Sequence, residues 1–287
     1  MPDYDYEEMK KEAEQYIKFE KDKKNRIAYV TLDRPDAKNA IDMAMHQELC
    51  RIWADFRDDP EVDVAILTGT GDSFCAGADL KTWVPANYVD ATPRRVREIV
   101  ELGLGGLTRG LHRISKPIVA AVNGWALAAG LELALACDIR IASDRAMFGS
   151  FEARRGFHHG DGGIVRLVNT CGVGVAMQML LTAEPLDAQR ALQCNLVAKV
   201  VPHDRLMEEA VLVAKQILRN SQRAVRSAKE TILGVIGKGL DEQLRVEAWN
   251  SYTVVDRAEA RAMLQRFYDK VDAGRAGATP TALDEKK

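Results

Sequence analysis

The sequence has no excess of either charge and no closely spaced cysteine pair. Its 40 Lys and Arg residues nearly balance 42 Asp and Glu residues, which gives a net charge of −2 at pH 7. Such a chain has no basic field to attract nucleic acid. The five cysteines are an odd number without a CxxC pair, which argues against a metal site and for reduced thiols. We therefore expect a cytoplasmic protein with no metal and no nucleic-acid partner.

Long hydrophobic segments are also scarce. The longest apolar segment, residues 117–137, nearly has the length to cross a bilayer, but it contains Asn123, Gly124 and Glu132. The first residues, MPDYDYEEMKKEAEQ, are acidic and lack an apolar segment, so we expect neither a signal peptide nor a transit peptide. These features predict a soluble protein with no membrane partner.

Motifs that mark several common enzyme classes are missing. The sequence contains no GxxxxGK[ST] phosphate loop, no HExxH zinc motif and no GxSxG nucleophile elbow. Its composition, 47% hydrophobic and 29% charged over 287 residues, is that of an ordinary globular protein with a substantial core.

Apolar strand segments alternate with loops and helical segments along the first two thirds of the chain. The strands are expected at 26–32, 64–69, 117–124 and 138–143, and the helices at 43–56, 94–114 and 131–137. This alternation predicts parallel strands with crossovers, hence an α/β layered or spiral core. From residue 204 onward only amphipathic helical stretches follow. We divide the chain into a charged extension (1–15), the core (16–203), a helical region (204–272) and a disordered tail (273–287).

Glu132 stands out because it lies in AVNGWALAAGLELALACDI, a run otherwise composed like a buried core. An unpartnered charge in an apolar site costs several kcal/mol or shifts its pKa. Either this residue ends a helix at the surface, or a dry pocket holds the carboxylate for chemistry. The composition of the run favours neither reading.

Two loops of small residues, CAGADLK (75–81) and GWALAAGLE (124–132), each follow a buried strand. Small side chains let a ligand approach the backbone, and two backbone N–H groups can together stabilise an oxyanion. A second carboxylate, Glu152, follows Glu132 by one strand and a turn, so both can reach one pocket and divide acid and base work. The alternative for Glu152 is a surface ion pair with Arg154 or Arg155.

Taken together, these loops and glutamates resemble the crotonase (enoyl-CoA hydratase/isomerase) family. The resemblance rests on LDRPDAKNAI, FCAGADLK, KPIVAAVNGWALAAGLELALACDIRIAS, AMFGSFEARRGFHHGDGG and LVAKVVP. It implies a ββα spiral core and C-terminal helices that build a homotrimer, or a dimer of trimers. It also implies an acyl-CoA substrate and no separate cofactor, because coenzyme A enters as part of the substrate.

Carried over by position, the resemblance assigns roles to individual residues. Ala78 and Gly130 match the two oxyanion N–H donors, and Glu132 and Glu152 match the two catalytic glutamates of the hydratases. The positions that match the coenzyme A site are Lys38, Ala40, Ala76, Asp79 and Leu80, with Lys270 as a substitute for a basic cluster that the last helix lacks. Two glutamates together favour hydration of a 2-enoyl-CoA.

The chain departs from the family after the second glutamate. Ordinary hydratases resemble PEILLGTIPGAGG, whereas this chain has FEARRGFHHGDGG. His158 and His159 replace an apolar residue and a proline, and either can bind a polar acyl group or shift the pKa of Glu152. We also expect Trp83 and Tyr88, from the long loop 82–93, to line the acyl pocket, although a mobile surface loop is an alternative.

The departures make an oxygenated, cyclic or aromatic acyl group plausible. Three related reactions remain as alternatives within the family: Δ3,Δ2-enoyl-CoA isomerisation, hydratase-lyase cleavage and ring-cleaving hydrolysis. Outside it, RNA binding is disfavoured by the acidic balance of charge, and a catalytically silent assembly protein is disfavoured by the presence of both glutamates.

Overall fold

The computed structural model describes residues 15–109 and 114–275. The chain divides into two compact units, one that runs to Asn220 and one that starts at Ser221. Two earlier expectations, the charged extension and the disordered tail, lie almost entirely outside the described residues.

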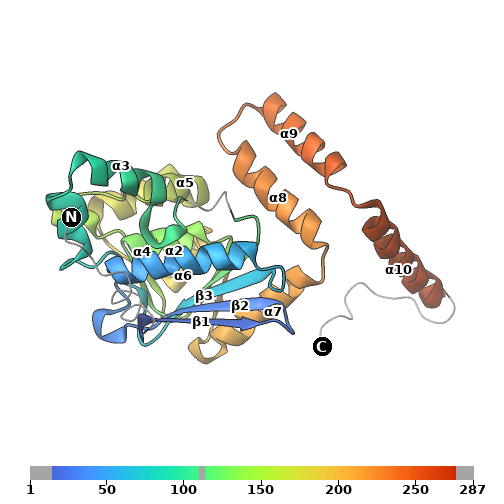
Figure 1. The fold of residues 1–287 in the computed structure, drawn as a ribbon, viewed down its shortest axis with the longest axis horizontal. Coiled ribbons are helices and arrows are strands. Elements are labelled where there is room, and N and C mark those ends of the chain that lie inside the picture. Colours follow the sequence, from blue (N-terminus) through green and yellow to red (C-terminus); the bar gives the residue numbers. More distant parts are fainter. Residues whose placement is uncertain (1–14, 110–113, 276–287) are drawn as a thin grey trace. The chain divides into compact units, whose positions relative to one another are not determined.

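A six-stranded sheet forms the centre of the first unit. Its strands, in spatial order, are β1 (Ile17–Asp22), β2 (Ile27–Leu32), β3 (Val64–Gly69), β5 (Ile118–Val122), β7 (Ile139–Ser143) and β10 (Lys199–Val201). Only the β1–β2 pair is antiparallel, and all later pairs are parallel. Figure 1 shows β1, β2 and β3 side by side. The predicted parallel sheet with crossovers is confirmed.

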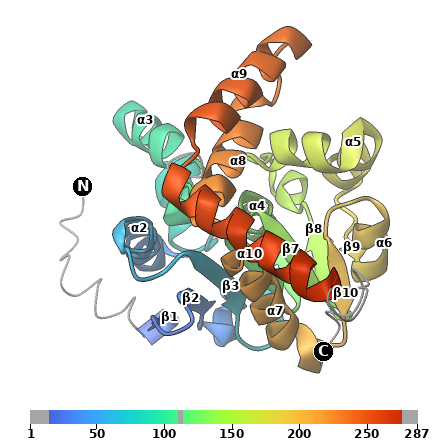
Figure 2. The same cartoon turned by 90° about the vertical axis from the view of Figure 1, so that its right-hand side faces the viewer.

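A smaller four-stranded sheet is built from short strands that follow those of the large sheet. Its order is β4 (Ser73–Cys75), β6 (Trp125–Leu127), β8 (Met147–Gly149) and β9 (Leu186–Asp187). The chain thus passes from β3 to β4, from β5 to β6 and from β7 to β8, and then enters helical segments that include α4 (Ala129–Ala136) and α5 (Gly163–Thr182). In Figure 2, α6 (Ala188–Gln193) lies next to β9. This is the expected ββα spiral.

The large sheet is covered by α7 (Leu206–Leu218), which belongs to the first unit. Leu206, Ala210 and Ala214 pack on a layer of strand side chains that includes Ile66, Val119 and Ile141. Burial of this apolar face is worth roughly 25 cal/mol per Å². The core therefore extends to Asn220, and the predicted boundary at residue 203 was too early because α7 is a core helix.

The segment between β4 and β5 differs most from expectation. The helix predicted over 94–114 ends as α3 (Pro93–Leu102), because Gly103 follows with φ of 68° and Gly105 and Gly106 are also left-handed. A short 3₁₀ turn, η3 (Leu104–Gly106), comes next and packs on α2 (Met43–Asp58). The preceding loop is ordered as well, since it contains the π-helical turn η2 (Pro85–Val89).

The second unit consists of α8 (Gln222–Val235), α9 (Leu240–Thr253) and α10 (Arg257–Arg275). Asn250 of α9 donates to the Thr231 hydroxyl of α8 at 2.8 Å. Large apolar side chains on these helices stay exposed in the single chain, among them Ile232, Leu240, Leu244, Trp249, Tyr252, Val255, Leu264 and Phe267. Helices with unburied apolar residues need a partner surface.

One helix in the described part of the chain, α5, has the length and hydropathy to cross a bilayer, and only 17% of its apolar window is buried. By sequence alone, the segment that comes nearest to this length is instead residues 117–137. Gly172 interrupts it with φ of 79° and ψ of 163°, so two shorter helices meet there. Its first residue, Gly163, donates its N–H to Glu132. These features make α5 an integral part of the folded unit.

Candidate active site

The small-residue loops meet where α4 begins. A Cβ on Gly130 would lie 2.0 Å from the carbonyl oxygen of Cys75, so only glycine lets the helix start against the end of β4. Ala128, just before the helix, has φ of 53°, a conformation that costs a non-glycine residue of order 1–3 kcal/mol. Within the residues that the structure describes, the N–H groups of Ala78 and Gly130 have no hydrogen-bond acceptor. They are available to a ligand.

Glu132 lies on the first turn of α4 and is 2% exposed. Its Oε1 accepts hydrogen bonds from the backbone N–H groups of Asp161 and Gly163, each at 2.8 Å. These donors compensate the loss of water around a buried carboxylate. Of the two readings of this residue, the surface helix end is therefore wrong and the buried carboxylate is correct.

Glu152 begins the 3₁₀ turn η5 (Glu152–Arg155) and is 5% exposed. The Ser150 hydroxyl donates to its Oε2 at 3.2 Å. Arg154 turns away and contacts the carbonyl of Ala183 and the carboxylate of Glu184. The surface ion pair considered for Glu152 is thus excluded.

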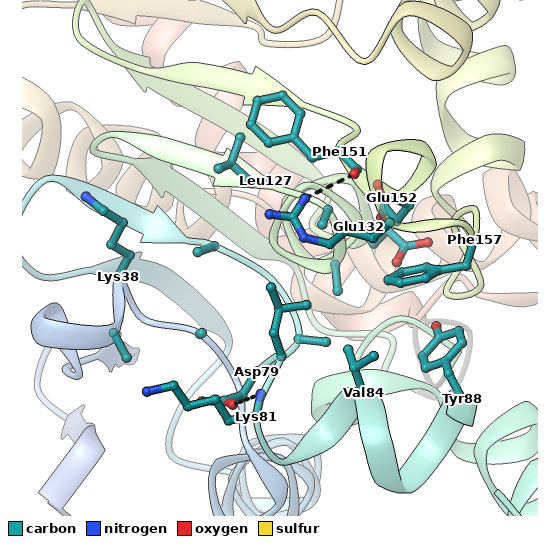
Figure 3. A pocket seen from close by; sticks show the side chains of 18 of the residues that line it. Lys38, Asp79, Lys81, Val84, Tyr88, Leu127, Glu132, Phe151, Glu152 and Phe157 are labelled. Atoms are coloured by element: carbon teal, nitrogen blue, oxygen red, sulfur yellow. Dashed lines mark hydrogen bonds between the residues drawn. The ribbon is translucent and has the colours of Figure 1, made fainter. Parts of the chain in front are cut away.

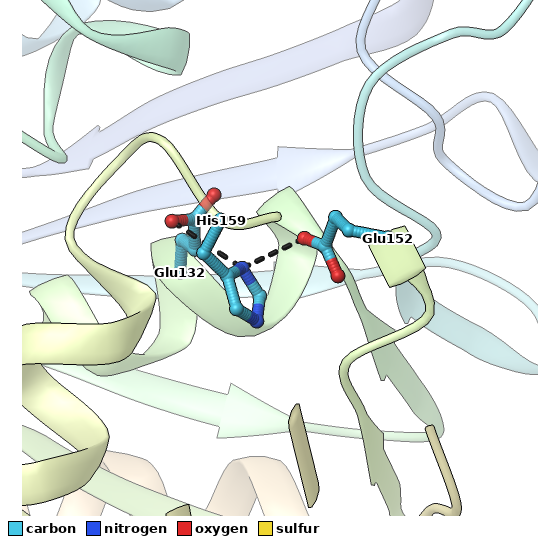
Figure 4. A group of neighbouring side chains, drawn as sticks. All are labelled: Glu132, Glu152 and His159. Atoms are coloured by element: carbon cyan, nitrogen blue, oxygen red, sulfur yellow. Dashed lines mark ion pairs between the residues drawn. The ribbon is translucent and has the colours of Figure 1, made fainter. Parts of the chain in front are cut away.

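His159 lies between the two glutamates, as Figure 4 shows. Its Nδ1 is 2.7 Å from Oε1 of Glu152 and 3.4 Å from Oε1 of Glu132, and its side chain is fully buried. Burial by itself lowers the pKa of His159, but the interactions with Glu132 and Glu152 outweigh burial and raise the pKa from 6.5 to about 9. The imidazole is therefore an imidazolium near neutral pH.

Asp161 fixes the loop that carries these donors. Its Oδ1 accepts from the N–H of Leu104 at 2.9 Å and lies 3.6 Å from the Arg109 guanidinium. Burial and the charge of Glu132 raise the pKa of Asp161. The side chain of Arg166 also donates to the Asp161 carbonyl, at 2.9 Å. The loop is thereby held to η3 and to α5.

A cavity of about 460 Å³ opens beside the glutamates. Glu132, Glu152 and Ala78 line it, and so does Ala129, the residue before Gly130, whereas Gly130 is not itself a lining residue. Figure 3 shows the two glutamates at one end of the cavity and Lys38 at the other. Further lining residues are Arg34, Lys81, Val84, Tyr88, Leu127, Phe151, Arg155 and Phe157. A pocket of this size fits a small-molecule ligand.

The aromatic end of the cavity contains one of the two aromatic residues expected there. Tyr88 lines it and stacks on Phe157 with ring centroids 5.0 Å apart. Burial, and then the charges of Asp161, Glu132 and Glu152, raise the pKa of Tyr88 to about 12, so its hydroxyl stays protonated.

Trp83 and His158 were wrongly placed in the acyl pocket. Trp83 is 2% exposed and packs edge-on against His46, because its helical turn directs the indole into the core. His158 is exposed, with Nδ1 2.7 Å from the carbonyl oxygen of His159. Of the two histidines, His159 is the one that contacts the glutamates.

The positions assigned to coenzyme A lie together along the outer part of the same cavity: Lys38, Ala40, Ala76, Asp79 and Leu80. The Asp79 carboxylate binds the Arg34 guanidinium at 2.8 Å and accepts the N–H of Lys81 at 2.8 Å. It therefore organises the loop rather than offering a free charge. Lys270 belongs to α10, but its side chain is outside the part of the chain that the structure describes.

Glu132, Glu152 and His159 also form a group whose ligand atoms lie within 4.8 Å of one another, the kind of cluster that can hold a metal ion. Oε1 of Glu132 already accepts two backbone hydrogen bonds, and Nδ1 of His159 approaches Glu152 as an ion pair. A metal ion would have to replace these contacts. We therefore interpret the cluster as a group that shares protons.

Comparison with known proteins identifies the class of this fold and site. A sequence profile described as enoyl-CoA hydratase/isomerase matches residues 22–274. The mevalonyl-coenzyme A hydratase sidH of Aspergillus fumigatus is 43% identical over 204 residues, which are 71% of this chain and 73% of that protein. The (E)-benzylidenesuccinyl-CoA hydratase of Thauera aromatica is 39% identical over 217 residues, 75% of this chain and 81% of that protein.

Solved structures agree. The enoyl-CoA hydratase of Mycobacterium tuberculosis H37Rv superimposes with a TM-score of 0.80 at 32% identity, covering 89% of this chain and 96% of that chain. The chain therefore belongs to the enoyl-CoA hydratase/isomerase family and is an enzyme of the crotonase fold, as its motifs predicted.

Several residues of the site were not predicted as site residues. Arg155 was noted as a departure from the family and as a possible ion-pair partner of Glu152, Phe151 was noted only as a departure, and Val84, Leu127 and Phe157 were not singled out. Leu127 and Phe151 could have been found from their places next to the glycine-rich loop and next to Glu152. Val84 and Phe157 carry no such signal, because η2 and the loop after η5 bring them to the cavity.

Gly163 is a point where the site tolerates no side chain. A Cβ there would lie 2.6 Å from Cγ of His159 and 3.0 Å from Cγ of Glu132, so Gly163→Ala forces both apart. We expect it to lower the free energy of unfolding by about 1–3 kcal/mol and to reduce turnover. Urea denaturation and steady-state assays measure both effects.

Gly174→Ala provides the control, because it lies in the same helix and its Cβ would meet nothing within 4 Å. Its unfolding free energy should stay within about 1 kcal/mol of wild type. Equal losses of stability in the two variants would contradict the proposed crowding at Gly163.

Proposed function

We propose that this enzyme adds water across the 2,3 double bond of an acyl-CoA thioester. The observation that carries the proposal is the convergence of Glu132 and Glu152 on one cavity, next to the unpaired N–H groups of Ala78 and Gly130. In this mechanism the two N–H groups bind the thioester oxygen and stabilise the enolate-like charge that develops on it. Glu132 deprotonates water for attack on C3, and Glu152 delivers a proton to C2.

Coenzyme A is proposed to enter as part of the substrate, with no separate cofactor. The small residues Ala40 and Ala76 leave room for a pantetheine chain beside the backbone, and Lys38 places a cation at the outer end. All five cysteines are free thiols, which supports our proposal that the enzyme works in a reducing compartment such as the cytoplasm.

Replacing Glu132 with glutamine tests the catalytic assignment. The carboxamide oxygen can still accept the N–H groups of Asp161 and Gly163, but the side chain can no longer take a proton from water. We expect kcat to fall by about 10²–10⁴ with little change in KM. Loss of enoyl-thioester absorbance with crotonyl-CoA, and mass spectrometry for the gain of one water, measure the reaction.

Glu48→Gln is the matched control. Glu48 is also a buried glutamate, but it pairs with Arg51 on α2, away from the cavity lining. It should leave kcat close to wild type. A Glu132→Gln enzyme as fast as the Glu48→Gln enzyme would refute the assigned role.

We further propose that the acyl group is polar or cyclic. Arg155 lines the same cavity as the two glutamates and forms no ion pair within the described ranges; its hydrogen bond is to the Phe151 carbonyl, at 3.4 Å. A cation without a counter-charge at the acyl end favours an oxygenated or carboxylated substrate. The hydratases named above for mevalonyl-CoA and benzylidenesuccinyl-CoA are consistent with such a substrate.

An acyl-CoA panel tests the role of Arg155. For an enoyl-CoA with a distal carboxylate or hydroxyl group, Arg155→Gln should lower kcat/KM about 10-fold or more, since a hydrogen bond to a charged group is worth roughly 1.5–3 kcal/mol. With crotonyl-CoA the change should be small. Arg154→Gln is the control, because Arg154 binds Ala183 and Glu184 outside the cavity. Equal losses on both substrates would count against this role.

We also propose that the chain forms a homotrimer or a dimer of trimers. The exposed apolar side chains of the second unit, and Val165, Val173, Met177 and Leu181 on α5, then become subunit contacts.

Light scattering after size exclusion should give three or six chains per particle. Trp249→Glu, which puts a charge at a residue 73% exposed in the single chain, should weaken the assembly, whereas Glu247→Gln should not. A monomeric wild-type protein would contradict the proposal.

A further inference from the structure

Among the residues that the structure describes, the imidazole of His159 has polar contacts with the two glutamates alone. Its Nδ1 lies at ion-pair distance from both carboxylates, but neither Nδ1 nor Nε2, which are both buried, has a partner in hydrogen-bond geometry within the described part of the chain. Nε2 lacks a partner whether or not it is protonated, so the carboxylates next to Nδ1 decide the charge of the ring. The ring also touches Gly163, where a Cβ would come within 2.7 Å of Nδ1. The site is therefore built around this histidine.

We propose that His159 holds, as an imidazolium, the proton that Glu152 delivers to C2, and that it recovers this proton from Glu132 after water has been deprotonated. The inference rests on the hydration proposed above. It makes His159 a positioning and proton-holding residue that acts through the two catalytic glutamates. Ordinary hydratases resemble the pattern PEILLGTIPGAGG, which has a proline at this position. A histidine between the two glutamates therefore distinguishes this chain.

The proton balance closes without any further reactant. In the resting site both carboxylates are ionised and the imidazole is protonated. When water attacks, its oxygen forms the bond to C3, and its proton goes to Glu132. Nδ1 passes its proton to Glu152, and the π electrons of the double bond form the new C2–H bond with that proton, which leaves Glu152 ionised and the imidazole neutral. Glu132 then returns its proton to Nδ1, and the resting state is restored.

Electrostatics explains why the extra proton resides on nitrogen. Oxygen atoms of Glu132 and Glu152 lie within 4.8 Å of each other, and two carboxylates this close repel, so without a cation one of them retains a proton. The imidazolium between them removes this repulsion. Other charged or titratable groups around the cluster are Asp161, Tyr88, Arg109 and Arg166.

The pH dependence of kcat/KM for crotonyl-CoA distinguishes this role from simple packing. Because the pKa of His159 is raised to about 9, the imidazolium is present below that pH and is lost above it. We expect the wild-type rate to fall on the alkaline side near pH 9. In His159→Gln the proton that is delivered to C2 must reside on one of the two carboxylates. The alkaline limb of the profile should therefore shift to lower pH by roughly one pH unit or more.

His158→Gln is the matched control, since His158 is the adjacent, exposed histidine and does not line the cavity. Its profile should match the wild type. A His159→Gln enzyme that is slower but has an unmoved alkaline limb would overturn the proposal, because a packing residue changes rate and stability without changing the titrating group. His159→Asn provides a second neutral variant if the glutamine variant fails to fold.

A nuclear magnetic resonance titration of ¹⁵N-histidine-labelled protein tests the charge directly and requires no substrate. The chain has five histidines, and the His158 and His159 variants assign their signals. His159 should titrate well above its ordinary pKa of 6.5, and titration at or below that value would overturn the proposal. Wild-type enzyme that hydrates no acyl-CoA would instead refute the proposed function, an outcome separate from either failure above.

Discussion

The site depends on one interaction, the pair of backbone hydrogen bonds that Asp161 and Gly163 donate to the Glu132 carboxylate. A buried carboxylate without such donors would take up a proton or turn toward water. The two bonds fix the oxygen that faces His159, and they tie α4 to the beginning of α5. The position of His159, the space at Gly163 and the distance to Glu152 all follow from them.

The ββα spiral makes that interaction possible. Strands β3, β5 and β7 of the large sheet are each followed by a short strand of the small sheet, so the loops after β4, β6 and β8 end at the same place. Gly130 then lets α4 begin directly against the carbonyl of Cys75. Parallel pairing is what brings residues far apart in the chain to one cavity, while the large sheet and α7 supply the rigid support.

His159 makes this site chemically different from a simple pair of carboxylates. With a cation between them, both glutamates can be ionised at once, and the group as a whole holds one proton that either carboxylate can exchange. Asp161 and Arg109 keep the surrounding loop in place, and Tyr88 adds a protonated hydroxyl at the acyl end. The loop that carries His159 thus sets proton transfer, and Tyr88 of η2 adds to the polarity of the pocket.

The sequence by itself determined the parallel α/β core, the two small-residue loops, the pair of glutamates and the family. These are local features: apolar strands, glycine where a backbone must approach closely, and acidic residues in apolar runs can be read without knowing the fold. It also located the helical C-terminal part, although α7 proved to belong to the core because only packing shows which apolar face meets the sheet.

Only the tertiary structure decided which neighbouring side chain faces the site. His158 and His159 are equivalent by sequence, as are Arg154 and Arg155, yet one of each pair turns inward and the other outward. The apolar periodicity predicted a helix to residue 114, but the helix ends before the left-handed glycines 103, 105 and 106. An apolar pattern does not reveal left-handed backbone conformations. Side-chain direction depends on backbone angles set by contacts between distant segments, and that is why the sequence could not supply it.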